Sequence, residues 1–271
     1  MLWPELRARA IQNRLRDQTV IRCHVRGVLL DIEGTTSSIA FVHEVMFPYV
    51  RQHLSEYLGQ HWQTAELQAV RQQVASDAGE PDWAAWLAAR LAALPVAVEP
   101  QAALASHIHE LMDRDVKATG LKQLQGLIWE SGFRTGALQA HVYPDVLPAI
   151  TAWRHRGIDV RIYSSGSIAA QRLFFGHVAG HGDCLPLFSG HYDTTSGSKR
   201  ESSSYTRIAR DWGLPPQQLL FVSDIAAELD AALAAGLQVV ASIRPGNAAL
   251  PETRNWPSID SFAQLELDLD P

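Results

Sequence analysis

Cysteine is scarce in this chain of 271 residues, which contains Cys23 and Cys184 and no others. The two are far apart, form no Cys-x-x-Cys pair and have no cluster of other ligand-type side chains nearby. A disulfide framework and a zinc site are therefore both disfavoured. Thiols that are buried or incidental fit a reducing compartment, so we expect a cytoplasmic protein.

Long apolar runs and an excess of positive charge are missing as well. No apolar stretch approaches the ~20 residues that a membrane-spanning helix needs. The chain has 23 Lys and Arg against 29 Asp and Glu, which gives a formal net charge of -6. This balance provides no basic field to attract a nucleic-acid backbone. We expect a small-molecule partner, with no nucleic acid and no membrane, and a monomeric chain.

The first 26 residues precede the first predicted strand and have an unusual pattern. Four arginines alternate loosely with apolar residues, whereas a transit peptide would be poor in acids and rich in serine. Glu5 and Asp17 are present, and serine is absent from this stretch. We interpret residues 1–26 as an N-terminal extension, either a surface helix or a frayed segment.

A mainly helical block follows a short apolar strand at residues 27–34. Within this block apolar residues recur at intervals of three and four, and strand signals are nearly absent. The predicted helices cover residues 43–57, 64–78, 83–93 and 101–116. We predict that residues 39–136 form a helical cap domain inserted after the first strand.

From Tyr143 onward strands and helices alternate. Apolar strands are predicted at residues 159–163, 187–192, 219–222 and 238–243, each separated from the next by a helical segment. Such repetition is typical of a parallel sheet with helices on both faces. The predicted fold class is α/β, with a Rossmann-like doubly wound parallel sheet built from residues 27–38 and 137–271.

Asp31 and Glu33 stand at the end of the first predicted strand. Alternation along a strand would point both carboxylates to the same side. One could attack a phosphorus atom and form an aspartyl-phosphate, while the other donates a proton to the leaving oxygen and later activates water. The alternative is an acidic strand exit that binds a divalent ion only, or nothing.

Asp224 follows the apolar strand 219–222, and Glu228 comes one helical turn later. Together with Asp31 they offer the hard carboxylate oxygens that Mg²⁺ takes, leaving room for water and a phosphate oxygen. Asp224 could instead be a helix N-cap, and Glu228 an ordinary carboxylate on a helix face.

Ser164, Ser165 and Gly166 lie between a strand and a helix, where hydroxyls and free N–H groups can cradle a phosphate. Capping of the helix would also account for them. Lys199 offers a cation that could neutralise a phosphoryl group during transfer, or it could be a solvated loop charge. The carboxyl ends of parallel strands share one edge of a sheet, so these segments can converge on one crevice.

With these motifs the chain resembles the haloacid dehalogenase-type phosphatases and, within them, the enolase-phosphatases (acireductone synthases) of methionine salvage. The wider superfamily usually has aspartate two residues after the nucleophile, and Glu33 in that place agrees with the narrower family. The resemblance covers roughly residues 25–265. The stretches that match best are residues 31–38, 162–167, 175–177 and 244–247.

The resemblance implies Asp31, Glu33 and Lys199 as catalytic residues and Mg²⁺ as cofactor. It places the metal on Asp31, Glu33 and Asp224, and the substrate on Lys199 and the two serines Ser164 and Ser165. Whether Glu33 acts as acid/base, as ligand or as both stays open.

The activity that the resemblance implies is a two-step reaction in one pocket. A 2,3-diketo-5-methylthiopentyl 1-phosphate would be enolised and then dephosphorylated to the acireductone 1,2-dihydroxy-3-keto-5-methylthiopentene. Two other functions are compatible with the residues: a generic small-molecule phosphatase of the same superfamily, and a phospho-accepting signalling module. The large helical insertion and Glu33 argue against the signalling module.

Overall fold

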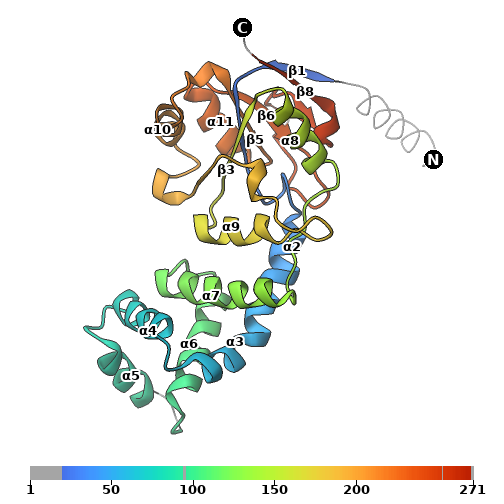
Figure 1. The fold of residues 1–271 in the computed structure, drawn as a ribbon. Helices are drawn as coiled ribbons and strands as arrows, with labels where there is room; N and C mark the ends of the chain where they lie inside the picture. Colours follow the sequence, from blue (N-terminus) through green and yellow to red (C-terminus); the bar gives the residue numbers. More distant parts are fainter. Residues whose placement is uncertain (1–19, 94–95, 252, 270–271) are drawn as a thin grey trace, which may run out of the picture. The chain divides into compact units, whose positions relative to one another are not determined.

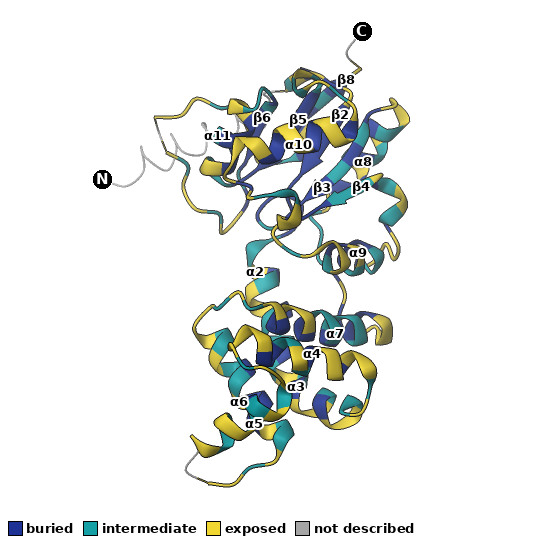
Figure 2. Cartoon of the chain, turned by 90° about the vertical axis from the view of Figure 1, so that its left-hand side faces the viewer, coloured by how far each residue is buried: buried dark blue, intermediate teal, exposed yellow. Residues whose placement is uncertain are grey.

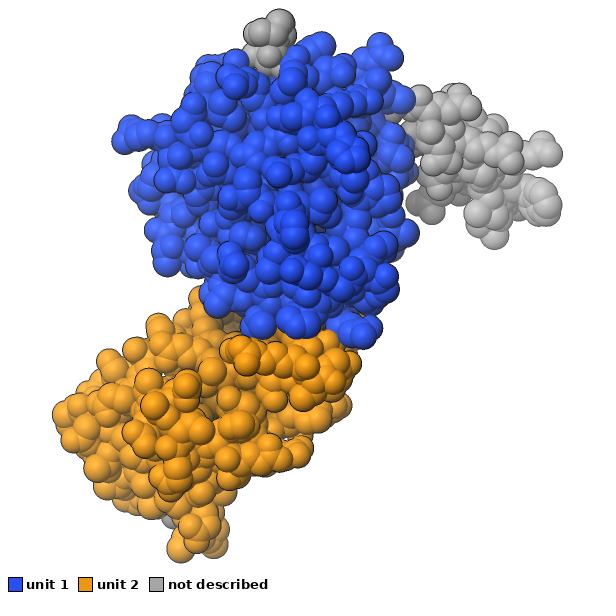
Figure 3. Space-filling view, in the orientation of Figure 1, with its two compact units in different colours: residues 1–42, 139–271 blue, residues 43–138 orange. Residues whose placement is uncertain are grey.

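The computed structural model describes residues 20–93, 96–251 and 253–269 (Figure 1). These residues form two compact units, coloured separately in Figure 3. One unit, called the α/β unit below, runs up to Val42 and resumes at Gln139; the other, called the helical unit, spans His43–Leu138. The helix or frayed segment predicted for the start of the chain falls mainly on residues 1–19, outside the described residues.

A parallel sheet forms the centre of the α/β unit. Within the described residues it has six strands in the order β4-β3-β2-β5-β6-β7. Leu30 of the central strand pairs with Ile162 on one side and with Val222 on the other, so three neighbouring strands end together. The strands are β2 (Gly27–Leu30), β3 (Asp159–Tyr163), β4 (Gly190–Tyr192), β5 (Leu219–Ser223), β6 (Gln238–Ser242) and β7 (Ser258–Ile259).

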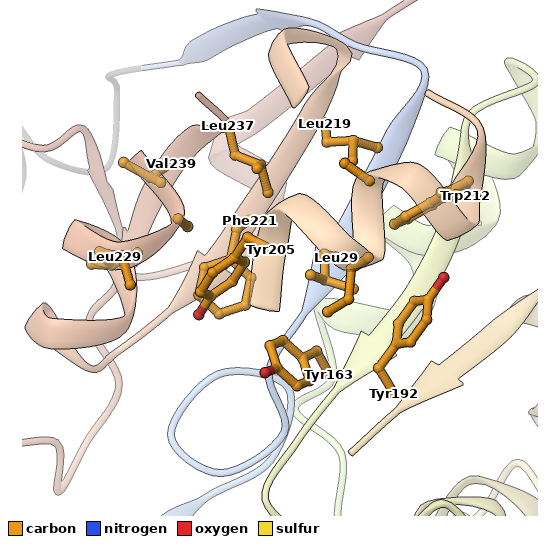
Figure 4. Close-up of a cluster of buried hydrophobic side chains, with 14 of the residues drawn as sticks. Leu29, Tyr163, Tyr192, Tyr205, Trp212, Leu219, Phe221, Leu229, Leu237 and Val239 are labelled. Atoms are coloured by element: carbon orange, nitrogen blue, oxygen red, sulfur yellow. The ribbon is translucent and has the colours of Figure 1, made fainter. Parts of the chain in front are cut away.

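Helices cover both faces of this sheet, as Figures 1 and 2 show. On one face α10 (Ser202–Trp212) and α11 (Ala226–Ala234) pack on every second residue of the strands, including Leu29 and Phe221 (Figure 4). The intervening strand residues, such as Leu30, are also buried and point to the opposite face, where α8 (Val146–His155) contacts β3. The predicted doubly wound α/β fold is confirmed.

Two strands outside this sheet were not predicted. β1 (Ile21–His24) pairs in parallel with β8 (Leu265–Asp268), which joins the described start of the chain to its end. Both strands are short, and their apolar residues alternate with charged ones such as Arg22 and Glu266, which form an ion pair. Such a short alternating segment predicts a strand only weakly, because the strand that stabilises it lies far away in the sequence.

The helical unit has its own apolar core, made by residues three or four apart on its helices (Figure 2). Its role as a cap stays a prediction. The helices are α3 (Phe47–His61), α4 (Ala65–Asp77), α5 (Trp83–Ala92), α6 (Pro100–Asp113) and α7 (Thr119–Thr135). A π-helix (Val42–Met46) precedes α3, and α2 (Ile39–Phe41) precedes the π-helix.

Sequence periodicity missed α7, which contains three glycines that weaken helix propensity. Tertiary packing explains one of them: a Cβ on Gly120 would lie 2.7 Å from Val74 Cγ2, so glycine lets α7 approach α4 closely. The Gly120 N–H also donates to Asp77 Oδ2 at 2.6 Å. No helix of the described residues is long and apolar enough to cross a membrane.

The remaining elements of the α/β unit are short apart from α9 (Ile168–Gly176). The strand predicted at residues 187–192 is confirmed but shorter: β4 covers Gly190–Tyr192, and Leu187 ends a 3-10 turn instead. The 3-10 turns are Leu185–Leu187, Thr194–Ser196, Pro216–Gln218 and Phe262–Gln264.

A partly buried ion pair between Arg244 and Asp145 joins the loops of the α/β unit. Arg244 donates to Asp145 Oδ1 at 3.2 Å and Oδ2 at 2.8 Å, and its Nε donates to the carbonyl of Thr35 at 3.2 Å. Asp145 also accepts from the backbone N–H of Phe262 at 2.6 Å. The pair therefore joins the loop after β2, the start of α8, the turn after β6 and the C-terminal segment.

Replacing Asp145 by Asn should lower the free energy of unfolding by on the order of 2 kcal/mol at neutral pH. Burial raises the pKa of Asp145, but the hydrogen bonds from Arg244 and Phe262 outweigh it and hold the pKa below its ordinary 3.8. The carboxylate thus stabilises the fold above that value, and its contribution is lost as the pH falls through the still lower folded pKa.

Urea unfolding of both proteins between pH 7 and about pH 3 measures this difference, which should shrink at the acid end. The control is Asp230→Asn, which breaks an exposed ion pair with Arg254 and should change stability little. A difference between Asp145→Asn and wild type that stays constant down to pH 3 would contradict the assignment.

Candidate active site

The loop that follows β2 is a tight turn that presents Asp31. The Asp31 N–H donates to the carbonyl of Val222 at 3.1 Å, so Asp31 still lies beside β5. Beyond it the N–H groups of residues 35, 36 and 37 all donate to the carbonyl of Ile32. Gly34 allows this turn with a φ of 74°, a value in the left-handed region that glycine favours. Asp31 is only 2% exposed, at the carboxyl end of the central strand.

Lys199 lies between two buried carboxylates. Its Nζ donates to Asp31 Oδ1 at 2.6 Å and forms an ion pair with Glu228 Oε2 at 2.7 Å. Tyr205 from α10 donates its hydroxyl to the Lys199 carbonyl at 2.8 Å, which fixes the backbone there. Burial would lower the pKa of Lys199, but Asp31 and Glu228 outweigh burial and raise it. Lys199 is therefore a buried cation, not a solvated loop charge.

Asp224 reaches the same cluster from the end of β5. A Cβ on Gly34 would lie 2.4 Å from Asp224 Oδ2, so the close approach of this carboxylate requires glycine at position 34. Burial and, after it, the charge of Asp31 raise the pKa of Asp224 to about 7. Two buried carboxylates, Asp31 and Glu228, thus contact the ammonium group of Lys199, and the buried carboxylate of Asp224 lies near enough for their charges to act on it.

Glu228 is part of this cluster, a role that its sequence position left open. It is 8% exposed, and Ser223 donates its hydroxyl to Glu228 Oε2 at 2.9 Å. From its sequence position Glu228 could be a metal ligand or a carboxylate on a helix face, and the resemblance did not imply it as a site residue. The signal that could have selected it is its spacing from Asp224: Asp224 directly precedes the N-cap of α11, and Glu228 lies in the first turn of that helix.

The predicted phosphate-binding serines differ in their surroundings. Ser164 is 1% exposed at the end of β3, and its hydroxyl accepts from the Gly166 N–H at 3.2 Å. Ser165 is exposed. Glu33 is half-buried on the loop after β2, where it forms a backbone bridge with Ser37. The structure therefore brings Asp31, Lys199 and Asp224 together and places Ser164 at the end of the neighbouring strand.

The donor set fits a hard divalent cation. Within the described parts of the chain no three His, Cys, Asp or Glu side chains are grouped as a metal site. Mg²⁺ does not need such a group, because it uses one or two carboxylates and keeps several waters or phosphate oxygens. Asp224 Oδ1 is buried and lacks a hydrogen-bond partner among the residues described, and a cation would satisfy it.

Comparison with known proteins agrees with this geometry. A model of the haloacid dehalogenase-like hydrolases matches residues 25–236. Enolase-phosphatase E1 of Azotobacter vinelandii is 45% identical over 242 residues, which cover 89% of this chain and 97% of that protein. The enzyme of the same name from Aquifex aeolicus is 43% identical over 243 residues, or 90% of this chain and 100% of that protein.

A solved structure is similar as well. The Unknown transcript 4 protein of Saccharomyces cerevisiae matches with a TM-score of 0.72 and 33% sequence identity. The match covers 88% of this chain and 98% of the yeast chain. The likeness therefore extends over both units of the chain.

Replacing Lys199 by Met should destabilise the metal-free protein, because Asp31 and Glu228 would face each other without the ammonium group. Loss of one partner of a buried ion pair typically destabilises by about 3–5 kcal/mol, so the melting temperature should fall by roughly 10 °C. A second change, Glu228→Gln, should restore part of this loss, and thermal unfolding of the two single variants and the double variant measures the coupling.

Lys117→Met is the matched control, since Lys117 pairs with Asp115 at the surface. Its melting temperature should stay within about 1 °C of wild type. If Lys199→Met melted no earlier than this control, Lys199 would not be the electrostatic centre of the cluster.

Proposed function

The chain belongs to the enolase-phosphatase family of the haloacid dehalogenase-like hydrolases, and we propose that Asp31 is the nucleophile of its phosphatase reaction. The enzyme is a phosphoric monoester hydrolase with enolase activity in methionine salvage. It converts 2,3-diketo-5-methylthiopentyl 1-phosphate to the acireductone and phosphate. The observation that supports the roles proposed below is the buried contact of Lys199 with Asp31 and Glu228 beside Asp224.

The phosphoryl step begins with attack of an Asp31 carboxylate oxygen on phosphorus. Lys199 holds Oδ1 at 2.6 Å, which fixes the orientation of the carboxylate. The P–O bond to the substrate breaks as the aspartyl-phosphate forms, and the leaving oxygen takes a proton from Glu33. Water then attacks the phosphorus with Glu33 as base, releasing phosphate and regenerating Asp31.

The phosphate itself is held by residues at the ends of neighbouring strands. The proposed contacts are the Lys199 ammonium group and the Ser164 and Ser165 segment that follows β3. Ser165 is exposed and thus accessible to a ligand, whereas the Ser164 hydroxyl receives a hydrogen bond from Gly166 and can donate its own proton. Phosphoryl transfer depends mainly on such positioning and charge stabilisation.

The proposed Mg²⁺ site consists of Asp31 and Asp224, with Glu33 on the same loop. Bound there, the cation would supply positive charge that stabilises a phosphoryl group and an enediolate oxygen alike. The protein contributes the excess of buried carboxylates over ammonium groups, which favours a divalent cation. One electrostatic arrangement would thus serve both half-reactions.

Replacing Asp31 by Asn should reduce phosphate release by at least about 10³-fold, because an amide oxygen is a poor nucleophile. Phosphate release from the diketone phosphate under saturating Mg²⁺ measures the effect. Circular dichroism should show an intact fold, and the exposed-site variant Asp230→Asn should retain wild-type turnover. Substantial residual turnover in Asp31→Asn would remove Asp31 from the nucleophile's role.

Removal of Mg²⁺ with a chelator should silence both enolisation and phosphate release, and added Mg²⁺ should restore both. The measurement follows the enolised intermediate and the acireductone by ultraviolet absorbance, in parallel with free phosphate. If enolisation continued in the presence of chelator, Mg²⁺ would be required for phosphoryl transfer only. Phosphate release from generic esters at equal efficiency, without acireductone from the diketone, would favour the generic phosphatase.

A further inference from the structure

The turn after β6 reaches the loop that carries Asp31. Asn247 Nδ2 donates to the carbonyl of Gly34 at 2.8 Å and to the carbonyl of Ser242 at 3.2 Å. Ser242 Oγ donates to the same Gly34 carbonyl at 3.2 Å. Both amide hydrogens of Asn247 are therefore used, and this hydrogen-bond pattern assigns which end of the amide is nitrogen.

The other end of the amide has no obvious use within the fold. Asn247 Oδ1 is buried and has no hydrogen-bond partner among the described residues. An unsatisfied buried acceptor is unfavourable, because it has lost its hydrogen bonds to water without gaining others. A polar atom held in this state by two hydrogen bonds at the opposite end of the same group points to a function that needs a donor there.

The position of Asn247 Oδ1, close to Asp224, indicates which kind of donor it could bind. A Cβ placed on Gly34 would lie 2.9 Å from Asn247 Oδ1 and 2.4 Å from Asp224 Oδ2. Both oxygens therefore lie against the position that a Cβ of residue 34 would occupy, on the same side of Gly34. Asp224 Oδ1 and Thr35 Oγ1 are also buried without a partner in the part of the chain described. The Asn247 amide oxygen and an ionised Asp224 carboxylate can only accept hydrogen bonds, so neither can satisfy the other, whereas a cation that carries water molecules would satisfy both.

We propose that Asn247 is a positioning residue of the metal centre, whose Oδ1 accepts a hydrogen bond from a water molecule carried by the divalent cation at Asp224. The inference rests on the proposed function, since it takes Asp224 as a metal ligand. A hydrated Mg²⁺ keeps several waters, and each needs an acceptor. Partners that orient a metal's waters and ligands typically change metal affinity 10–100-fold.

A purely structural role for Asn247 is the competing explanation. In that case its amide nitrogen would hold the Gly34 carbonyl, and its oxygen would be idle. Asn247→Asp separates the two roles, because it keeps an oxygen acceptor and loses both donor hydrogens. Ser242→Ala is the matched control, because it removes a donor from the same Gly34 carbonyl and leaves Asn247 intact.

Calorimetric titration of the substrate-free, full-length protein with MgCl₂ tests the proposal without reference to turnover. Asn247→Ala should weaken Mg²⁺ binding by about tenfold or more. Asn247→Asp should bind within about threefold of wild type or more tightly, and Ser242→Ala should bind like wild type. If Asn247→Ala does not fold, Asn247→Ser takes its place, because its shorter side chain withdraws the oxygen from the site.

Three outcomes overturn the inference. Wild-type affinity in Asn247→Ala would show that the oxygen is idle, and equal weakening in Asn247→Ala and Asn247→Asp would leave only the structural role. Wild-type protein that binds no Mg²⁺ would overturn the proposed magnesium dependence and this inference with it. Asp224→Asn tests whether Mg²⁺ binds at the proposed site. If Asp224→Asn abolishes Mg²⁺ binding while Asn247→Ala leaves the affinity unchanged, the proposed function stands and the proposed role of Asn247 is wrong.

Discussion

The buried contact of one ammonium group with two carboxylates is the constraint on which the rest of this structure depends. Lys199, Asp31 and Glu228 are almost fully buried, and their ion pairs are 2.6 and 2.7 Å long. A buried ion pair contributes little net stability, since desolvation offsets most of its attraction. With Asp224 beside it, the cluster has more negative charge than its own lysine balances. Such an excess of buried negative charge adds little stability but favours a divalent cation, whose charge would in turn attract a phosphate dianion.

The scaffold around the cluster is made largely of backbone contacts. Parallel pairing aligns the ends of β2, β3 and β5, and the turn at Gly34 brings the chain close enough for Asp224 to touch it. Two side chains of the turn after β6 donate hydrogen bonds to this loop: Arg244 to the carbonyl of Thr35 and Asn247 to the carbonyl of Gly34. The loop after β2 is therefore fixed from the turn after β6, a segment more than 200 residues away in the sequence.

Much of this was predictable from particular residues. Apolar runs that end in Asp31, Ser164 and Asp224 identified three of the strands, and the change from helical periodicity to strand-helix alternation identified the α/β fold, whereas the order of the strands in the sheet came from the structure. β1, β8 and α7 were missed because they depend on partners: two short strands that pair across the chain, and a glycine-containing helix that packs against α4. Sequence spacing offered Glu228 as a candidate without deciding its role, and the roles of Arg244 and Asn247 depend on contacts with the distant loop after β2.

The sequence by itself determined which chemical groups are present and at which strand ends they stand, because apolar periodicity is a local property of the chain. Only the tertiary structure decided their electrostatic state. Burial and neighbouring charges make Lys199 a firmly held cation, bring Glu228 into the cluster and leave the oxygens of Asp224 and Asn247 without partners among the described residues. Those properties depend on distances between residues that are remote in sequence, which folding alone establishes.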